Sequence, residues 1–336
     1  MEVLYAFAMT KSASDHFPTG TPLQWRPITS DDVGPWLELL LRMAKVDEPD
    51  WVEERADLER IIESSKTDPT KDTILGLDDA GVPRAVGAIQ RNPGSTVVHS
   101  TGGVDPDWRR RGIGAALYGW QTGRARRRLD DDGAAAGVLR TYAEERVPSQ
   151  LALMEVTGNS VARYFTEMTR ALQAEIPAVE IPAGLQIVTF SDALSEAVRL
   201  AHNEAFQDHW GSEPRDEESW RFTVTHPEFR PDWSLAVVDE GTGEVAAYQL
   251  ASFDPASREM LGHTEGYTDL LGVRRKWRGL RLAPALLAEA MRRFKADGME
   301  QAGLGVDTEN PSGALGLYER LGYQPTHRVR VYELPI

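Results

Sequence analysis

The segment VDTENPSGALGLYERLGY, residues 306–323, decides how the rest of this chain is interpreted. An apolar strand, AGLGV, runs into Asp307, and Pro311 opens a short helix that ends before another strand. Asn310 carries a side-chain amide that can bond the amide groups of an extended ligand. Tyr318 follows two helical turns later on roughly the same face, with a hydroxyl whose ordinary pKa is about 10. A turn cap at Asn310 and a packing role for Tyr318 are the alternative interpretation.

The chain contains one pattern twice. Residues 104–118 read VDPDWRRRGIGAALY, and residues 273–287 read VRRKWRGLRLAPALL. In both, the end of a strand is followed by Trp-Arg, a short loop and the start of a helix with small residues. The period is about half of the 336 residues, which indicates a duplicated domain and not a solenoid.

The repeat and the composition between its copies predict the domain organisation. We expect a flexible N-terminal segment at 1–20, a first domain at 21–175, a Pro-rich linker at 176–184 and a second domain at 185–336. Each half has the same expected order: a strand, two helices, three strands, a long helix, and a strand–helix–strand tail. This order implies an α/β class with a mixed sheet flanked by helices.

The two loops have the features of a pyrophosphate site. Glycines after a strand allow successive N–H groups to point inward, and the helix that follows adds the partial positive charge of its N-terminus. The first loop, RRRGIG, has both glycines, whereas the second reads RGLRLA. Arg281 replaces Gly112 there and Ala283 replaces Gly114, which leaves open whether the second loop curls like the first.

The spacing of Asn310 and Tyr318 resembles that of the GNAT N-acyltransferase family. The order of strands and the loop after the fourth strand also resemble this family, and both occur in each half. The resemblance covers nearly all of the chain beyond residue 20. The resemblance implies two tandem domains, each a mostly antiparallel sheet with a splayed strand pair. It implies acetyl-CoA as donor, with the pantetheine arm held by Asn310 and the departing thiolate facing Tyr318. The other donor-binding positions that it implies are Val104, Arg109, Arg110, Arg111, Gly112, Ile113 and Gly114 in the first half, and Leu271, Val273, Arg278, Gly279, Leu280, Arg281, Leu282 and Ala283 in the second.

Acyl transfer to an amine needs a base, a polarised thioester carbonyl and a proton for the thiolate. Tyr318 is the candidate acid. Alternation along the strand before the second loop places Glu265, Tyr267, Asp269 and Leu271 on one face. Asp269 is the candidate base, with Glu265 further along, and an ion pair of Asp269 with a nearby cation is the alternative. His202 and His263 are weaker candidates for the base.

The first half lacks this chemistry. The aligned positions differ between the halves: Met154, Arg146 and Ser100 in the first against Tyr318, Asn310 and Asp269 in the second. We therefore expect catalysis in the second domain only. This division resembles the tandem GNAT proteins of the mycothiol synthase group, whose catalytic Glu would fall near Tyr267 here, so that role does not transfer.

Composition limits the partners. A net charge of −15 argues against a nucleic-acid surface and suits a cationic small amine. The absence of cysteine excludes disulfides and a Cys nucleophile, and no apolar run is long enough for a membrane span. We expect a cytoplasmic monomer or homodimer without a metal ion. A non-catalytic acyl-CoA-binding protein is the alternative function.

Overall fold

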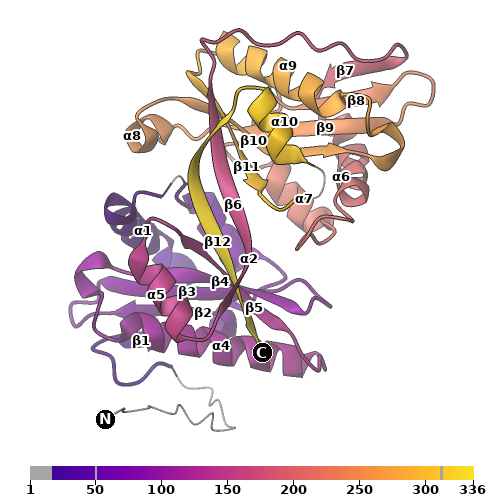
Figure 1. The fold of residues 1–336 in the computed structure, drawn as a ribbon. Helices are drawn as coiled ribbons and strands as arrows, with labels where there is room; N and C mark the ends of the chain where they lie inside the picture. The colour runs from indigo at the N-terminus through magenta and orange to yellow at the C-terminus, as the bar shows by residue number, and fades with distance from the viewer. Residues whose placement is uncertain (1–16, 50, 311–312) are drawn as a thin grey trace, which may run out of the picture. The chain divides into compact units, whose positions relative to one another are not determined.

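The structure is a computed structural model that describes residues 17–49, 51–310 and 313–336 (Figure 1). Most of the segment 1–20 lies outside these residues, and so does Pro311, where a helix is expected to begin. The chain divides into two compact units. Unit 1 consists of the described residues up to Ala162 together with Val331–Ile336, and unit 2 of Arg163–Arg330. The expected linker, 176–184, lies within unit 2.

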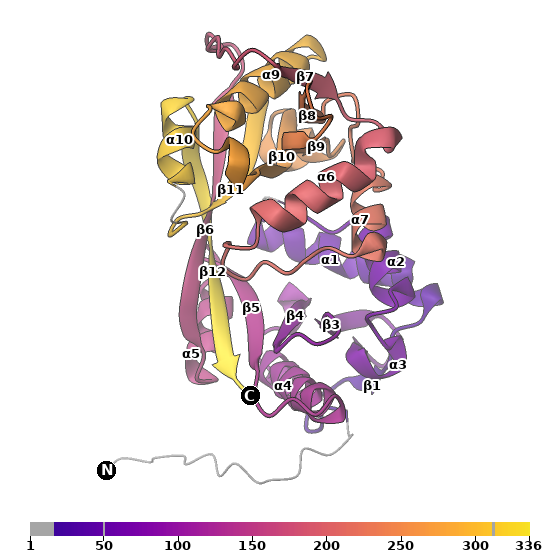
Figure 2. The same cartoon turned by 90° about the vertical axis from the view of Figure 1, so that its right-hand side faces the viewer.

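Unit 1 is a mixed sheet in the order β1-β2-β3-β4-β5. Its successive pairs are antiparallel except β4 with β5, which is parallel. Helices α1 and α2 pack on one face of this sheet and α4 on the other (Figure 2). The elements are β1 (Gln24–Arg26), α1 (Val33–Asp47), α2 (Arg55–Glu63), α3 (Pro69–Asp72), β2 (Thr73–Leu77), β3 (Pro83–Gln90), β4 (Val97–Val104), α4 (Ile113–Asp131), β5 (Val138–Glu144) and α5 (Pro148–Val156).

The last residues of the chain complete unit 1. Strands β6 (Ser160–Ala171) and β12 (Gln324–Pro335) each have residues in both units. At the end of β12, Ile336 exchanges two backbone hydrogen bonds of 2.9 Å with Gly137, just before β5. In the same unit, Arg140 of β5 pairs with Glu333 at 2.6 Å. The second half of the sequence therefore supplies part of the sheet that the first half builds.

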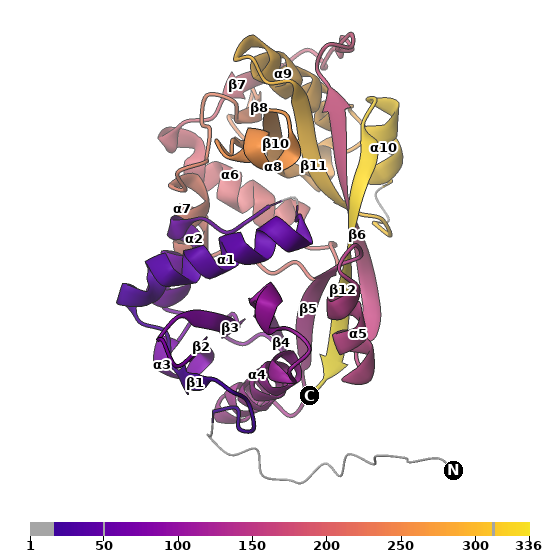
Figure 3. The same cartoon turned by 90° about the vertical axis from the view of Figure 1, so that its left-hand side faces the viewer.

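Unit 2 has the strand order β12-β6-β11-β10-β9-β8-β7. Strands β10 and β11 are parallel, whereas β6–β11, β9–β10, β8–β9 and β7–β8 are antiparallel. The core around α9 and α10 and the core around α6 and α7 lie on opposite faces (Figures 1 and 3). The elements are β7 (Leu185–Thr189), α6 (Asp192–Ala205), α7 (Glu217–Val224), β8 (Leu235–Asp239), β9 (Val245–Ser252), α8 (Ser257–Leu261), β10 (Glu265–Val273), α9 (Leu282–Ala296), β11 (Gln301–Asp307) and α10 (Ala314–Arg320). The predicted mixed sheet flanked by helices, present twice, is confirmed.

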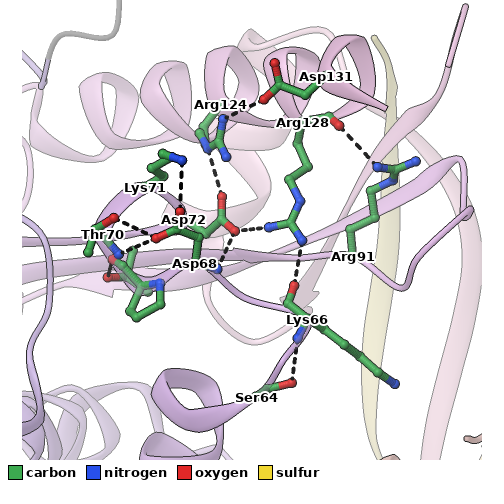
Figure 4. Close-up of polar contacts among 12 residues, drawn as sticks. Ser64, Lys66, Asp68, Thr70, Lys71, Asp72, Arg91, Arg124, Arg128 and Asp131 are labelled. Carbon is green, nitrogen blue, oxygen red and sulfur yellow. Dashed lines mark hydrogen bonds and ion pairs between the residues drawn. The ribbon is translucent and has the colours of Figure 1, made fainter. Parts of the chain in front are cut away.

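A buried ion-pair cluster fixes α4 of unit 1 to the start of β2. Asp72 is completely buried and accepts hydrogen bonds from Arg124 Nε at 2.8 Å and from the backbone N–H of Asp68 at 2.9 Å. Arg128 also pairs with Asp72 and donates to the carbonyl of Lys66 at 2.7 Å (Figure 4). A buried carboxylate needs such partners because burial removes its hydration.

Candidate active site

The parallel strands of unit 2 separate along their length. Strands β10 and β11 pair only from Glu265 with Gln301 to Thr268 with Leu304. Beyond that point β11 stays paired with β6 as far as Asp307, whereas β10 stays paired with β9 as far as Val273. The two strands therefore open a wedge, which is the predicted splayed pair.

A β-bulge lies in β10 where the wedge begins. Thr268 pairs with Ala251 and Leu270 with Leu250, so Asp269 is the extra residue. A bulge leaves one residue outside the ladder and reverses the alternation of the side chains that follow. The prediction that Leu271 shares a face with Asp269 is wrong for this reason, because Leu271 packs into the core around α9. The equivalent strand of unit 1, β4, pairs with β3 without a register shift from 99 to 104.

The loops that follow β4 and β10 curl in the same way. In unit 1, Arg110 and Gly112 have positive φ values of 64° and 78°. In unit 2, Gly279 and Arg281 have positive φ values of 82° and 60°. Each loop thus has two left-handed residues at matching positions, one glycine and one arginine, in opposite order. The question that the sequence left open is answered: Arg281 adopts the backbone conformation that glycine has in unit 1.

The arginine that begins each loop is anchored to the strand before it. Arg109 Nε donates to the carbonyl of Val104 at 3.0 Å, and Arg278 Nε to that of Val273 at 3.2 Å. Arg109 also pairs with both oxygens of Asp47 at 2.6 Å. Asp47 neutralises the Arg109 guanidinium, which therefore has a structural partner within unit 1.

The first helical turn after the unit 2 loop offers backbone donors. The initial N–H groups of a helix have no intrahelical acceptor, and α9 begins at Leu282. Pro284 lacks an N–H, so the available donors of this turn and loop are those of Gly279, Leu280, Arg281, Leu282 and Ala283. These are the positions at which the sequence predicts phosphate binding.

Tyr318 lies on α10, within the core around α9. It is 9% exposed, and its ring meets that of Tyr323 edge-on at 6.1 Å. Burial raises the pKa of the Tyr318 hydroxyl to about 12. The phenol therefore keeps its proton throughout the neutral and moderately alkaline range, as a proton donor requires.

Asp269 reaches solvent on the opposite face of the sheet. Its side chain is exposed, and Oδ1 accepts a hydrogen bond from Ser252 Oγ at 2.9 Å. The surrounding protein raises the pKa of Asp269 to about 7 by desolvation, opposed by Ser252 and by the charges of Arg215 and His226. Water can reach the carboxylate, although the protein around it removes part of its hydration. A carboxyl with this pKa changes its charge near neutral pH.

Two glycines of β11 make room for carboxylates on the same face as Asp269. A Cβ atom at Gly303 would lie 2.2 Å from Glu265 Oε1, and one at Gly305 would lie 2.8 Å from Glu167 Oε1. Tyr267 donates to Glu167 Oε2 at 2.7 Å. The sequence prediction included Glu265 but missed Glu167, which comes from β6. Glycines within an apolar strand indicate that another group lies close to the backbone, and these two glycines were the sequence signal for the nearby carboxylates.

Asn310 follows β11 and contacts a residue that the sequence prediction also missed. Its Nδ2 lies 3.4 Å from Nε2 of His209, in the segment after α6. The other histidine of this region, His202, is buried and its Nδ1 bonds the hydroxyl of Tyr248 at 2.6 Å. His202 thus belongs to the core.

The corresponding positions of unit 1 have structural partners. Ser100 is buried and shares a hydrogen bond of 2.6 Å with Thr141 on β5. Met154 is buried in the core beside α4. Arg146 donates to the carbonyl of Glu48 at 2.6 Å.

Comparison with known proteins agrees with this architecture. The sequence profile of the Acetyltransferase (GNAT) family matches residues 195–323. A GCN5-related N-acetyltransferase from Sphaerobacter thermophilus superposes with a TM-score of 0.72 at 25% identity, over 95% of this chain and 97% of that one. A tandem GNAT protein from the clavulanic acid biosynthesis pathway superposes with a TM-score of 0.69 at 18% identity, over 93% of this chain and 98% of that one. The fold is therefore that of tandem GNAT proteins.

Curated relatives define the family. The mycothiol acetyltransferase of Salinispora arenicola is 31% identical over 238 residues, which cover 66% of this chain and 67% of that protein. That of Acidothermus cellulolyticus is 28% identical over 233 residues, with 66% of each chain covered. These matches span about two thirds of the relatives' length. The chain belongs to the GNAT acetyltransferase family, whose members use acetyl-CoA as donor. Among the described residues, no helix has the length and apolar character needed to cross a membrane.

Proposed function

We propose that this protein is an acetyl-CoA-dependent N-acetyltransferase that acts on a small amine by direct transfer in unit 2. The observation that carries the proposal is the bulge at Asp269, at the point where β10 and β11 separate. A backbone N–H outside the ladder can polarise a thioester carbonyl placed in the wedge. The matching strand of unit 1 keeps a regular register from 99 to 104, which supports catalysis in unit 2 alone.

The donor is proposed to cross the wedge. Its pyrophosphate would meet the N–H groups of residues 279–283 and the partial charge of the α9 N-terminus. Its pantetheine arm would run along β10 beside Leu271 and Val273 and bond the amide of Asn310. Arg278 remains 45% exposed at its side chain, which leaves it accessible to a phosphate. In unit 1 the equivalent Arg109 is already paired with Asp47, and we propose that unit 1 does not catalyse.

The transfer is proposed to use groups on both faces of the sheet. The amine nitrogen attacks the thioester carbon, the C–S bond breaks, and the acetyl group forms an amide. Asp269 accepts the proton that the amine loses, directly or through water, and Tyr318 gives its proton to the thiolate sulfur. Glu265 lies further along the face of Asp269. The Tyr318 side chain belongs to the α9 face, and Asp269 faces the region of α7.

The acceptor is proposed to be a cationic amine. Glu167, Glu265 and Asp269 lie on the same side of the unit 2 sheet, where carboxylates favour an ammonium group before it loses a proton. The named relatives are mycothiol acetyltransferases. In this chain the catalytic glutamate of that group would fall near Tyr267, which is hydrogen-bonded to Glu167. We therefore propose a small amine as the acceptor and do not propose mycothiol synthesis.

Release of CoA thiol tests this function. The full chain is mixed with acetyl-CoA and a panel of primary amines, and the free thiol and the acetylated amine are both measured. Formation of both with one amine supports the proposal. Tight binding of acetyl-CoA without turnover on any cationic amine would contradict it and favour an acyl-CoA-binding protein.

A further inference from the structure

The C-terminal end of α6 and the residues that follow it contact both elements at which donor binding is proposed. The carbonyl of Ala205 accepts from Arg278 at 3.1 Å, and Asp208 lies 3.7 Å from the same guanidinium. His209 Nε2 lies 3.4 Å from Nδ2 of Asn310. One short segment therefore connects the phosphate loop with the amide expected to hold the pantetheine arm. We call Asp208 and His209 the brace of unit 2.

Unit 1 has the same brace in other residues. Asp47 is the last residue of α1 and Glu48 is its C-cap. They occupy the place in unit 1 that Asp208 and His209 occupy after α6 in unit 2. Asp47 pairs with Arg109, the first residue of the phosphate loop, and the Glu48 carbonyl accepts from Arg146 at 2.6 Å. Arg146 occupies the position that aligns with Asn310. In both units, residues at the end of the first long helix connect the loop arginine with the residue at the Asn310 position. The brace is therefore part of the architecture of the fold.

The two braces differ in chemistry. In unit 1, Asp47 is 9% exposed at its side chain and bonds Arg109 through two contacts of 2.6 Å. In unit 2, Asp208 is 53% exposed and its contact with Arg278 is longer, at 3.7 Å. The contact with the second element is a backbone carbonyl in unit 1 and a titratable imidazole, that of His209, in unit 2. The imidazole contact of unit 2 can change with the protonation of His209, whereas the corresponding contact of unit 1 is made by a backbone carbonyl, which does not titrate.

An aromatic stack holds the His209 ring. Its centroid lies 4.4 Å from that of Phe206, which in turn lies 4.5 Å from that of His202. His202 is bonded to the hydroxyl of Tyr248 at 2.6 Å, in the core beneath α6. The His209 ring thus lies against Phe206, which packs on the buried His202, so that the ring can in turn orient the amide of Asn310.

The contact between these two side chains depends on protonation. An amide NH2 only donates, so Nε2 of His209 must accept, which requires a neutral ring with its proton on Nδ1. We propose that His209 is a positioning residue for the acyl donor: its neutral ring turns the oxygen of Asn310 toward the pantetheine arm. A protonated ring presents an N–H to the amide, reverses the amide and removes that acceptor. The inference rests on the proposed role of Asn310.

The groups around His209 determine the pH at which its ring becomes protonated. Burial lowers the pKa of His209, Asp307 raises it, Arg278 lowers it and Asp208 raises it, with a net lowering. The stacked His202 stays neutral in the same range because burial lowers its pKa to about 3. Since His209 titrates below its ordinary pKa, the neutral ring dominates at pH 7 and above. Donor affinity should fall as the pH is lowered through the pKa of His209.

Calorimetric binding of acetyl-CoA to the full chain between pH 5 and pH 8 tests the inference. We compare the wild type with His209→Gln, which does not titrate, His209→Ala, and the matched control His327→Gln on β12. In the wild type, Kd should rise about tenfold more than in His209→Gln as the pH falls, the effect of one hydrogen bond. His209→Ala should bind several-fold more weakly at pH 8, with KM raised and kcat unchanged. His327→Gln should follow the wild type.

The outcomes separate the two proposals. Titration of the donor's own phosphates affects all variants alike and cancels in the comparison. If wild type and His209→Gln lose affinity equally at low pH, or if His209→Ala binds as tightly as the wild type at pH 8, His209 does not position Asn310. If the wild type does not bind acetyl-CoA at any pH, the proposed function itself is wrong.

Discussion

Arg281 has the left-handed backbone conformation of Gly112, its counterpart in the other copy, with φ values of 60° and 78°. Two residues earlier in each loop, at Gly279 and Arg110, the residue types are exchanged. The shape of each loop therefore depends on two residues in the left-handed conformation. Either position can hold a non-glycine residue. A left-handed conformation costs a non-glycine residue about 1–2 kcal/mol, which each loop accepts once.

Gly279→Ala should destabilise unit 2 by about 1–2 kcal/mol, because it puts a second side chain at positive φ. A Cβ atom at Gly279 meets nothing within 4 Å, so the effect comes from the backbone and not from a clash. The matched control is Gly119→Ala in the middle of α4, where a Cβ atom also meets nothing within 4 Å and the backbone is helical. That change should stabilise by up to about 1 kcal/mol. Equal effects of the two substitutions on the urea midpoint would refute the argument.

Asp72→Asn should destabilise unit 1 by about 3–5 kcal/mol, because it leaves the charges of Arg124 and Arg128 without the buried carboxylate. The comparison is Asp232→Asn in unit 2, at an ion pair with Arg230 in which Asp232 is 55% exposed. Surface pairs of this kind contribute about 0–1 kcal/mol. Urea unfolding followed by tryptophan fluorescence measures both. A smaller loss for Asp72→Asn than for Asp232→Asn would show that the cluster of Figure 4 does not hold α4 in place.

Local pattern was sufficient to predict the duplication, most of the order of the elements and both loops, because alternation and helical periodicity can be recognised within a short stretch of sequence. The short helices α3 and α8 were not predicted. Local pattern did not predict the bulge at Asp269, after which Leu271 lies on the other face of the sheet. An apolar run such as LLGV is compatible with either alternation of side chains, so the sequence does not show the extra residue. Local pattern missed Glu167 and His209 because each reaches its partner, Tyr267 or Asn310, across the fold. The return of the last residues to unit 1 likewise depends on pairing between distant segments.

The activity should depend on the ionisation of Asp269. With a pKa of about 7, this carboxyl is protonated and inactive as a base at pH 5, and deprotonated at pH 9. The kcat at saturating acetyl-CoA should therefore rise with pH through about 7 and then level off. In Asp269→Asn the rate should be lower and this rise should be absent.

Ser252→Ala provides a matched test of the same group. The hydroxyl of Ser252 stabilises the charged carboxylate, so that its removal should raise the pKa of Asp269 and move the rise in kcat to higher pH. Glu265→Gln keeps this hydrogen bond and should leave the position of the rise closer to that of the wild type. An identical pH profile in wild type and Asp269→Asn would remove Asp269 from the mechanism.

Tyr318→Phe should lower kcat by about 10²–10⁴-fold, the usual contribution of a general acid, and leave acetyl-CoA affinity nearly unchanged. The ring stays in the core around α9 and keeps its edge-on contact with Tyr323, so that stability should change little. The matched control is Tyr323→Phe, which removes a hydroxyl from the neighbouring buried ring and should not alter kcat to the same degree. Stopped-flow detection of thiol release measures the step itself. If Tyr318→Phe releases CoA as fast as the wild type, the proton for the thiolate comes from another group, such as water.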